Sequence, residues 1–223
     1  MKIAVCYSGL FRTFDGFLEN HKAALPEADY YFSTWTSEKE KTNGSNLDVR
    51  LFDAPEVDYN LYQGSFALEY GADHQNKSSE RKRLYTATMQ HLGHYLVTDS
   101  ISKDYDMVIR MRYDTVIGKH DWLSLITRAY KNNIAIGVGN ANGGDDNNGT
   151  MTRNVPTIHG NSNKFMLDFM NIHKRNNIAD AVAMNNNMSL WPTNAGWYQL
   201  LSMNYGGHEN YRGGIQLQRY ARG

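Results

Sequence analysis

The sequence predicts a three-layer α/β/α protein with a mostly parallel central sheet, on three observations. Its 223 residues suit one domain, with or without a small lobe. Short apolar runs alternate with segments of helical periodicity, which is the pattern of strands joined by helices. The chain opens as strand 2–7, helix 14–24 and strand 29–35, and a right-handed crossover of this kind joins parallel strands.

The strands are predicted from apolar or aromatic runs that stop at polar residues. The first run ends at Ser8-Gly9, and the second, DYYFSTW, ends at Trp35. The first is followed by a turn into the helix, and the second by polar residues that indicate a loop over 36–46. The predicted strands cover residues 2–7, 29–35, 48–52, 106–112 and 133–139.

The helices are predicted from apolar residues spaced by three and four positions. Thr13 is the expected N-cap of the first helix, and Pro26 stops it. The stripe of this helix consists of Phe14, Phe17, Leu18 and His21. The inward side chains of helix 121–130 are Trp122, Leu125, Ile126 and Ala129. The predicted helices cover residues 14–24, 79–98, 121–130, 162–174 and 193–203, and the Gly-, Tyr- and Arg-rich tail 204–223 is given no element.

The charge balance argues against a general nucleic-acid binder. The chain has 23 basic and 23 acidic residues, so its formal net charge is zero and it has no bulk basic field. A local basic patch is still compatible with this composition. Arg81-Lys82-Arg83 is such a short cluster, and a solvated helix face is its ordinary interpretation.

The single cysteine and the hydropathy pattern indicate the compartment. One cysteine, Cys6, rules out an internal disulfide framework, and its apolar surroundings predict a small buried side chain. No stretch approaches the ~18 apolar residues of a membrane span, and the N-terminal run is too short for a signal peptide. We therefore expect a soluble protein of a reducing compartment, the cytoplasm, or the host cytoplasm if the protein is viral.

Polar residues follow three of the predicted strands where ligands bind in α/β sheets, beyond the carboxyl ends. The first end carries Ser8, Gly9 and Arg12, and the second carries Thr34 and Trp35. The central strand ends in RMRYD. Because residues two apart on a strand share a face, its charged side chains are expected to project together. They are Arg110, Arg112 and Asp114.

The chemistry of these ends suits a metal diphosphate. The Asp114 carboxylate is a hard oxygen ligand of the kind that Mn²⁺ or Mg²⁺ takes, and guanidinium groups bind phosphate oxygens in pairs. Gly9 allows close backbone approach at a helix start that favours anions. The alternatives are that the charges of RMRYD pair with one another, and that residues 8–13 form an ordinary strand-to-helix turn. Residues 8–13 have neither a Walker nor a dinucleotide-type glycine pattern.

Four stretches resemble a group of small GT-A type glycosyltransferases. They are KIAVCYSGLFRTF, FSTW, YDMVIRMRYD and VPTIHGNSNKFMLDF. In that group the central strand ends in an aspartate where other GT-A enzymes carry their Asp-x-Asp metal motif. The resemblance implies one GT-A-like domain over 1–223, with a Rossmann-like nucleotide-sugar-binding half at 1–118 and an acceptor-side half at 119–223.

The resemblance also implies an activity, the transfer of a sugar from a nucleoside diphosphate sugar, a UDP-sugar foremost, to an acceptor hydroxyl. The metal, Mn²⁺ or Mg²⁺, would be bound by Asp114, which is also a catalytic candidate. Arg110 and Arg112 would orient the donor. The other expected substrate contacts are Ser8, Gly9, Arg12, Thr34, Trp35 and Gly160.

The catalytic base and the remaining metal ligand are less clearly marked. An inverting enzyme needs a base for the acceptor hydroxyl, and Asp146, in the Asn- and Gly-rich loop 140–150, and His159 are the candidates. His208 is a candidate metal ligand or phosphate contact. Solvated loop acids and surface histidines are the ordinary alternative for all three. His94, three residues after His91 on the predicted helix 79–98, is expected at the surface.

Two questions stay open at this stage. The acceptor is a glycan or, as for small phage sugar transferases, a modified DNA base of the hydroxymethylcytosine type. The activity has two alternatives, a non-catalytic nucleotide- or sugar-binding module and a nucleotidyltransferase. The first alternative is motivated by Trp191-Pro192-Thr193-Asn194, which lacks the acid of the Pro-Glu pair that relatives often show there.

Overall fold

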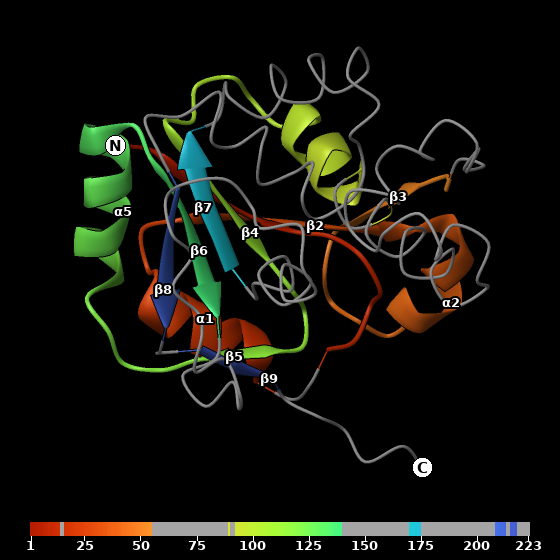
Figure 1. The fold of residues 1–223 in the computed structure, drawn as a ribbon. Coiled ribbons are helices and arrows are strands. Elements are labelled where there is room, and N and C mark those ends of the chain that lie inside the picture. Colours follow the sequence, from red (N-terminus) through yellow and green to blue (C-terminus); the bar gives the residue numbers. More distant parts are fainter. Residues whose placement is uncertain are drawn as a thin grey trace, which may run out of the picture.

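A seven-stranded sheet organises the protein, in the strand order β3-β2-β1-β4-β7-β6-β8 (Figure 1). The structure is a computed structural model, and it describes residues 1–13, 16–54, 89, 92–139, 170–174, 208–212 and 215–217. The sheet strands are β1 (Ile3–Tyr7), β2 (Asp29–Trp35), β3 (Val49–Phe52), β4 (Met107–Met111), β6 (Ala135–Gly139), β7 (Met170–Lys174) and β8 (His208–Arg212). A separate small sheet pairs β5 (Thr115–Ile117) with β9 (Ile215–Leu217).

The large sheet is mostly parallel, as the sequence predicts. β1 pairs in parallel with β2 and β4, and β2 does so with β3. β7 runs antiparallel to both of its neighbours, β4 and β6, while β6 and β8 are parallel. Among these strands only β7 therefore opposes the common direction, and the other strands point their carboxyl ends to one edge.

Helices cover both faces of the sheet, which gives three layers (Figure 1). One face packs against α1 (Phe17–Ala24) and α5 (Trp122–Asn132), whose inward side chains belong to the larger hydrophobic cluster. The other face packs against a helix over residues 92–99, which carries Val97 into a smaller cluster. The predicted three-layer fold is thus confirmed. None of the helices in the described ranges has the length and hydropathy needed to cross a membrane.

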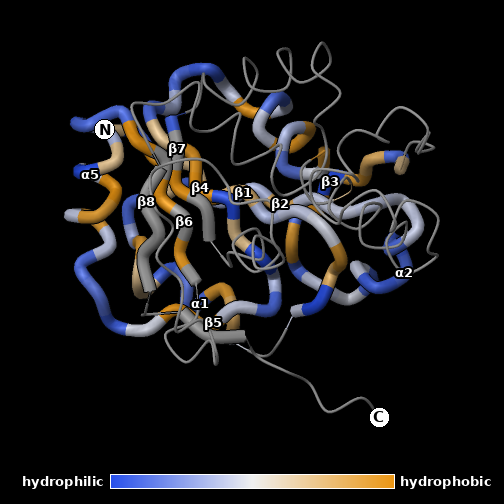
Figure 2. The backbone as a smooth tube through the Cα atoms, in the orientation of Figure 1, coloured by the Kyte–Doolittle hydropathy of each residue, from blue (hydrophilic) through white to orange (hydrophobic). Residues whose placement is uncertain are grey.

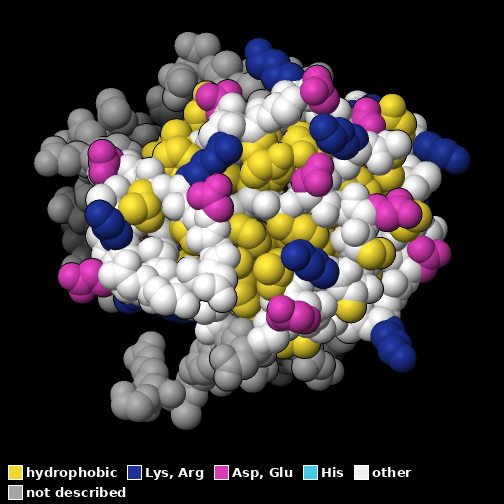
Figure 3. All heavy atoms as spheres, turned by 180° about the vertical axis from the view of Figure 1, so that it is seen from behind, with side chains coloured by type: hydrophobic (Ala, Val, Ile, Leu, Met, Phe, Trp, Pro, Cys, Tyr) yellow, Lys and Arg dark blue, Asp and Glu magenta, His cyan; other side chains and the backbone are white. Residues whose placement is uncertain are grey.

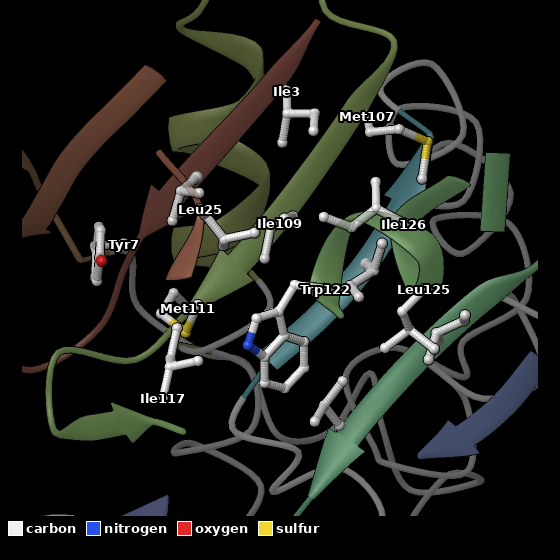
Figure 4. Packing of buried hydrophobic residues seen from close by; sticks show 14 of the residues in the cluster. Ile3, Tyr7, Leu25, Met107, Ile109, Met111, Ile117, Trp122, Leu125 and Ile126 are labelled. Atoms are coloured by element: carbon white, nitrogen blue, oxygen red, sulfur yellow. The ribbon is translucent and has the colours of Figure 1, made fainter. Parts of the chain in front are cut away.

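The alternation of side chains along β1 and β4 builds the two clusters. Val5 pairs with Ile109 in register, and both side chains enter the larger cluster with Trp122 and Ile126 of α5 (Figure 4). The residues between them, Cys6 among them, face the 92–99 helix. Both faces of these strands are buried, which is why they are apolar apart from Arg110, and β4 is largely orange in Figure 2.

The helices α1 and α5 lie where the sequence predicts them, but the first residue and the cap of α1 differ from the prediction. α5 buries the four side chains expected, and Asp121 caps it by accepting a hydrogen bond from the Ser124 backbone N–H at 3.0 Å. α1 begins later than predicted, at Phe17, and its N-cap is Gly16 at φ 75° instead of Thr13. Two short helical pieces after β2, η1 (Thr36–Glu38) and α2 (Lys39–Thr42), fall in a region predicted as a loop.

One predicted helix is wrong over its last residues. Residues 170–174 form strand β7, which lies between β4 and β6, and not the end of a helix over 162–174. Its central residue, Ile172, is fully buried between Ile109 and Ile136. Pairing on both sides outweighs the helical spacing of the local sequence. The strands β5, β8 and β9 were likewise not anticipated, while the predicted helix 193–203 lies outside the described residues.

Candidate functional site

The strand order places a topological switch point between β1 and β4. The chain leaves β1 for β2 on one side, and it returns from β3 to β4 on the other side of β1. The connections that follow β1 and β4 therefore diverge at the carboxyl edge, which is where open α/β sheets bind ligands. Two of the three motifs found in the sequence, Ser8-Gly9 and Arg112 to Asp114, follow these two strands directly.

The turn after β1 exposes backbone and buries one hydroxyl. Gly9 has φ 103°, a conformation that glycine adopts without strain and that other residues rarely adopt. Ser8 is only 4% exposed, and its Oγ has no hydrogen-bond partner among the described residues. A buried hydroxyl without a partner is costly, so this atom is suited to meet a ligand.

Side chains from β2 and from the turn after β4 hold the three strand ends together. Thr34 Oγ1 donates to the carbonyl of Gly9 at 2.7 Å, and Ser33 Oγ donates to the carbonyl of Tyr7 at 2.8 Å. The hydroxyl of Tyr113 donates to the carbonyl of Ser33 at 2.9 Å. Thr34, which the sequence predicts as a substrate contact, thus holds the turn after β1 through a hydrogen bond to its backbone.

Trp35 is buried at the same edge. Its ring lies against Gly93 of the 92–99 helix, where an added Cβ would stand 3.3 Å from the ring and 3.5 Å from Ser8 Cβ. The helix can approach Ser8 and Gly9 this closely because residue 93 has no side chain. Since Trp35 is 5% exposed, its contribution in this arrangement is to back the turn, with little surface left for a substrate.

The two charged residues after β4 bind each other. Arg112 Nε donates to Asp114 Oδ1 at 2.9 Å, and Arg112 NH2 donates to Asp114 Oδ2 at 2.8 Å. The strand ends at Met111, and Thr115 Oγ1 closes the following turn by donating to the carbonyl of Arg112 at 2.7 Å. The spacing of two does bring these side chains together, and the result is the mutual pairing that the sequence left as an alternative.

Arg110 is placed differently from the other two. It lies within β4, opposite Cys6 of β1, and therefore on the sheet face that the 92–99 helix covers. The residue is 3% exposed, so its guanidinium group is held inside the protein. His94 on that helix is fully buried as well, which corrects the prediction that it lies at the surface.

A buried network beneath the turn connects it to α1. The Tyr7 hydroxyl hydrogen-bonds His21 Nδ1, and His21 Nε2 bonds the carbonyl of Thr115 at 2.7 Å. Because a carbonyl only accepts, Nε2 carries the proton, and Nδ1 accepts from Tyr7. Burial lowers the pKa of His21 to about 4, and it raises the pKa of Tyr7 and of Tyr113 above the usual range.

Only a faint signal in the sequence indicates this network. His21 falls on the apolar stripe of the first helix, and a histidine in such a place must find partners inside the protein. The partners Tyr7 and Thr115 lie 14 and 94 residues away along the chain, and nothing local in the sequence points to them.

Several predicted site residues do not meet Asp114 in the described structure. Arg12 is exposed beyond the first turn, and its side chain makes no described contact with Asp114. Asp146, His159 and Gly160 lie outside the described residues, so the structure places none of them. No group of three or more His, Cys, Asp or Glu side chains suited to a metal occurs in the described ranges.

The register of the sheet separates His208 from Asp114. One row across the sheet passes through Ile109, Ile172, Ile136 and Glu209. His208 lies one residue before this row, whereas Asp114 lies beyond the carboxyl end of β4. Strands are spaced by about 4.8 Å, so β8, three strands along, is also displaced by roughly 14 Å. The backbone thus keeps His208 apart from Asp114.

The fold is shared with structures of nucleotidyltransferases. A 4-diphosphocytidyl-2C-methyl-D-erythritol synthase of Anaerococcus prevotii matches with a TM-score of 0.51 and 6% identity, over 98% of this chain and 93% of that one. A protein assigned as a glucose-1-phosphate thymidylyltransferase of Bacillus anthracis, in complex with a sucrose, matches with a TM-score of 0.53 and 7% identity, over 97% and 88%. At these identities the likeness concerns the fold alone.

A third structure is less similar. The galactosyltransferase LgtC, in complex with donor and acceptor sugar analogs, matches with a TM-score of 0.42 and 11% identity, over 93% of this chain and 72% of that one. A likeness at this level supports no functional conclusion. The sequence itself matches no protein-family model and no curated protein.

Proposed function

We propose that the protein is a transferase that binds a nucleoside diphosphate sugar at the carboxyl edge of β1, β2 and β4. One observation carries the proposal. At the switch point, a buried hydroxyl without a described partner, Ser8 Oγ, lies in the turn beside a glycine of positive φ, and a carboxylate follows the neighbouring strand. The residues 1–118 would form the nucleotide-sugar half, and 119–223 the acceptor-side half.

The reaction proposed first is glycosyl transfer, which the sequence resemblance supports. The acceptor oxygen forms a bond to the anomeric carbon of the sugar, and the bond from that carbon to the diphosphate oxygen breaks. The nucleoside diphosphate leaves, and the acceptor proton passes to a base, for which Asp146 and His159 are the candidates. Backbone N–H groups at Ser8-Gly9 and the guanidinium of Arg112 would stabilise the charge that develops on the leaving phosphate.

The described residues fit a divalent cation on one condition. Mg²⁺ and Mn²⁺ are bound through one or two carboxylates, and substrate phosphates and waters complete the shell, so the single carboxylate of Asp114 is sufficient. Both of its oxygens now accept hydrogen bonds from Arg112. Arg112 must therefore release Asp114, and the diphosphate oxygens are the partners to which its guanidinium would turn. Bound there, the cation supplies Lewis-acid stabilisation of the leaving group.

Nucleotidyl transfer is the second candidate, because the Bacillus anthracis structure, with a TM-score of 0.53, is assigned as a thymidylyltransferase. In that reaction the phosphate oxygen of a sugar phosphate attacks the α-phosphorus of a nucleoside triphosphate, and pyrophosphate leaves. The same edge of the sheet would hold the nucleotide in both cases. The two reactions differ in their products, which makes them separable by one assay.

The assay supplies the protein with Mn²⁺ and either a panel of UDP-sugars or UTP with a sugar 1-phosphate. Release of UDP from a UDP-sugar, with water as a slow acceptor, supports glycosyl transfer. Release of pyrophosphate from UTP establishes nucleotidyl transfer in its place. If nucleotides bind with neither product formed, the protein is a binding module, as the missing acid near Trp191 suggests. If no nucleotide binds at all, the proposal is wrong.

The acceptor is proposed as a glycan or a modified DNA base. On the face shown in Figure 3, Lys and Arg side chains are interspersed with Asp and Glu and with hydrophobic groups, so that face carries no basic field for a phosphate backbone. Comparing a hydroxymethylcytosine-containing duplex with simple sugars as acceptors decides between the two classes.

A further inference from the structure

We propose that Asn20 and His21 of α1 are positioning residues, which fix the turn bearing Arg112 and Asp114 against the turn after β1. This role rests on the proposed function, and the strand-end motifs do not reveal it. Its basis is a set of hydrogen bonds between two side chains of α1 and the backbone of β5.

Asn20 acts as a neighbouring strand for β5. Its Nδ2 donates to the carbonyl of Ile117 at 2.9 Å, and its Oδ1 accepts from the N–H of Ile117 at 2.8 Å. The N–H and carbonyl of one extended residue point to the same side of a strand, and β9 pairs with β5 as its other neighbour. One amide group thus satisfies both backbone groups of Ile117.

His21 extends this edge by one more bond. Its Nε2 donates to the carbonyl of Thr115, two residues before Ile117, and backbone groups two residues apart face the same edge of a strand. Thr115 follows Asp114 directly, and its hydroxyl closes the turn on the carbonyl of Arg112. The hydrogen bond from His21 therefore anchors the residue that directly follows Asp114, and in this way α1 fixes the position of the Asp114 carboxylate.

The same histidine reaches the other turn. Its Nδ1 accepts from Tyr7, the last residue of β1, and Ser8 and Gly9 follow. One imidazole thus joins the end of β1 to the start of β5, and both of its nitrogens are committed. Ring stacking of Tyr7 on His21, with centroids 5.6 Å apart, fixes the plane of the imidazole. A shift of α1 would change the spacing between Asp114 and the Ser8-Gly9 turn.

The test uses MnCl₂ and UDP with the full chain. Asn20→Ser removes both bonds to Ile117, and the matched control, Glu19→Ser, changes the adjacent residue of the same helix. We expect the Mn²⁺ concentration that half-saturates UDP binding to rise about 10-fold in Asn20→Ser, because groups that orient a metal ligand typically change its affinity by 10- to 100-fold. Glu19→Ser should retain the wild-type value.

His21→Gln is the second variant. Its amide nitrogen keeps a donor for the Thr115 carbonyl, but its amide oxygen does not take the position of Nδ1, so the bond from Tyr7 is weakened. We expect a partial rise in the half-saturating Mn²⁺ concentration, between those of Glu19→Ser and Asn20→Ser. Hydrogen exchange at the Ile117 amide, measured on the same samples, should quicken in Asn20→Ser alone and so verifies that the bond is lost.

The outcomes separate the two proposals. Wild-type protein that binds neither Mn²⁺ nor UDP overturns the proposed function, and the positioning role falls with it. Wild-type binding that persists unchanged in Asn20→Ser, with faster exchange at Ile117, overturns the positioning role and leaves the proposed function in place. If Asn20→Ser does not fold, His21→Gln decides by the same comparison, and an unchanged half-saturation there rejects the inference.

Discussion

The two edges of the sheet hold similar carboxylates in different ways, and β4 shows the contrast at its two ends. At the amino edge, Asp106 accepts from the backbone N–H of Lys2 at 2.7 Å, and its side chain is 40% exposed. At the carboxyl edge, Asp114 is bound by the fork of Arg112 and its side chain is 12% exposed. The first carboxylate ties two strand starts together, and the second is held by a guanidinium group, which we propose exchanges it for a ligand.

The hydroxyl groups of the two edges repeat the difference. At the amino edge, Tyr105 donates to Asp29 Oδ2 at 2.6 Å and its oxygen lies 2.5 Å from that of Tyr31, so the network is closed within the protein. At the carboxyl edge, the Ser8 hydroxyl is buried with no partner among the described residues. A closed network contributes stability, whereas an open one at a switch point is suited to binding.

The largest expected effect comes from removing the carboxylate at the carboxyl end of β4. Asp114→Ala should abolish the strengthening of UDP binding by Mn²⁺, a loss of about 100-fold or more, because it deletes a ligand and not merely a partner of one. Asp106→Ala, its counterpart at the amino edge, should bind Mn²⁺ and UDP as the wild type does. Calorimetric titration of both variants measures this, and equal binding by the two would erase the distinction between the edges.

Low pH should destabilise the carboxyl edge through His21. The pKa of His21 is about 4 in the folded chain, below the unfolded value of about 6.5. Between these pH values the unfolded chain therefore binds a proton at His21 and the folded chain does not. The free energy of unfolding should fall by about 3 kcal/mol as the pH decreases from about 6.5 to about 4. Urea unfolding across this range measures the slope. His21→Gln should flatten it.

Removing the arginine should change metal and nucleotide binding in opposite directions. In Arg112→Gln the carboxylate of Asp114 no longer has to exchange its bidentate partner, so Mn²⁺ alone should bind about fivefold more tightly. UDP alone should bind more weakly, because a guanidinium contact to phosphate is lost. Titrations with each ligand separately test this. An unchanged affinity for Mn²⁺ in Arg112→Gln would show that Arg112 does not compete with the metal for Asp114.

The smallest effect is expected at the amino edge. Tyr105→Phe removes the hydroxyl from the closed network with Asp29 and Tyr31, at a cost of about 1 kcal/mol in the free energy of unfolding. UDP and Mn²⁺ binding should be unaffected, since this edge has no part in the proposed site. Chemical denaturation and a single titration suffice, and weakened ligand binding would contradict the division between the edges.

The elements that could be predicted from the sequence are those with strong local patterns. β1, β2 and β4 are continuous apolar or aromatic runs, and their predicted bounds agree with the structure within about one residue at each end. α5 has a clear stripe and a capping aspartate. Crossover geometry predicts that the first strands are parallel. Because parallel strands end at the same edge, it also predicts that the motifs after β1, β2 and β4 lie at that edge.

The remaining elements depend on distant partners. β7 is a strand because it lies between β4 and β6, and its own residues give helical spacing equally well. β5 is a three-residue strand held by Asn20 and by β9, which is about a hundred residues further along the chain. His208 was proposed as a ligand from its glycine-rich context, and the register that separates it from Asp114 is a long-range property.

The burial of Cys6 gives the protein an internal reporter of its own opening. The chain has no other cysteine, and this one lies in β1, between β2 and β4, with none of its surface accessible. A thiol reagent can reach the sulfur only when the sheet face covered by the 92–99 helix opens, so the labelling rate measures how often that happens. Comparing that rate with and without nucleotide would show whether an occupied carboxyl edge stabilises the packing of that face.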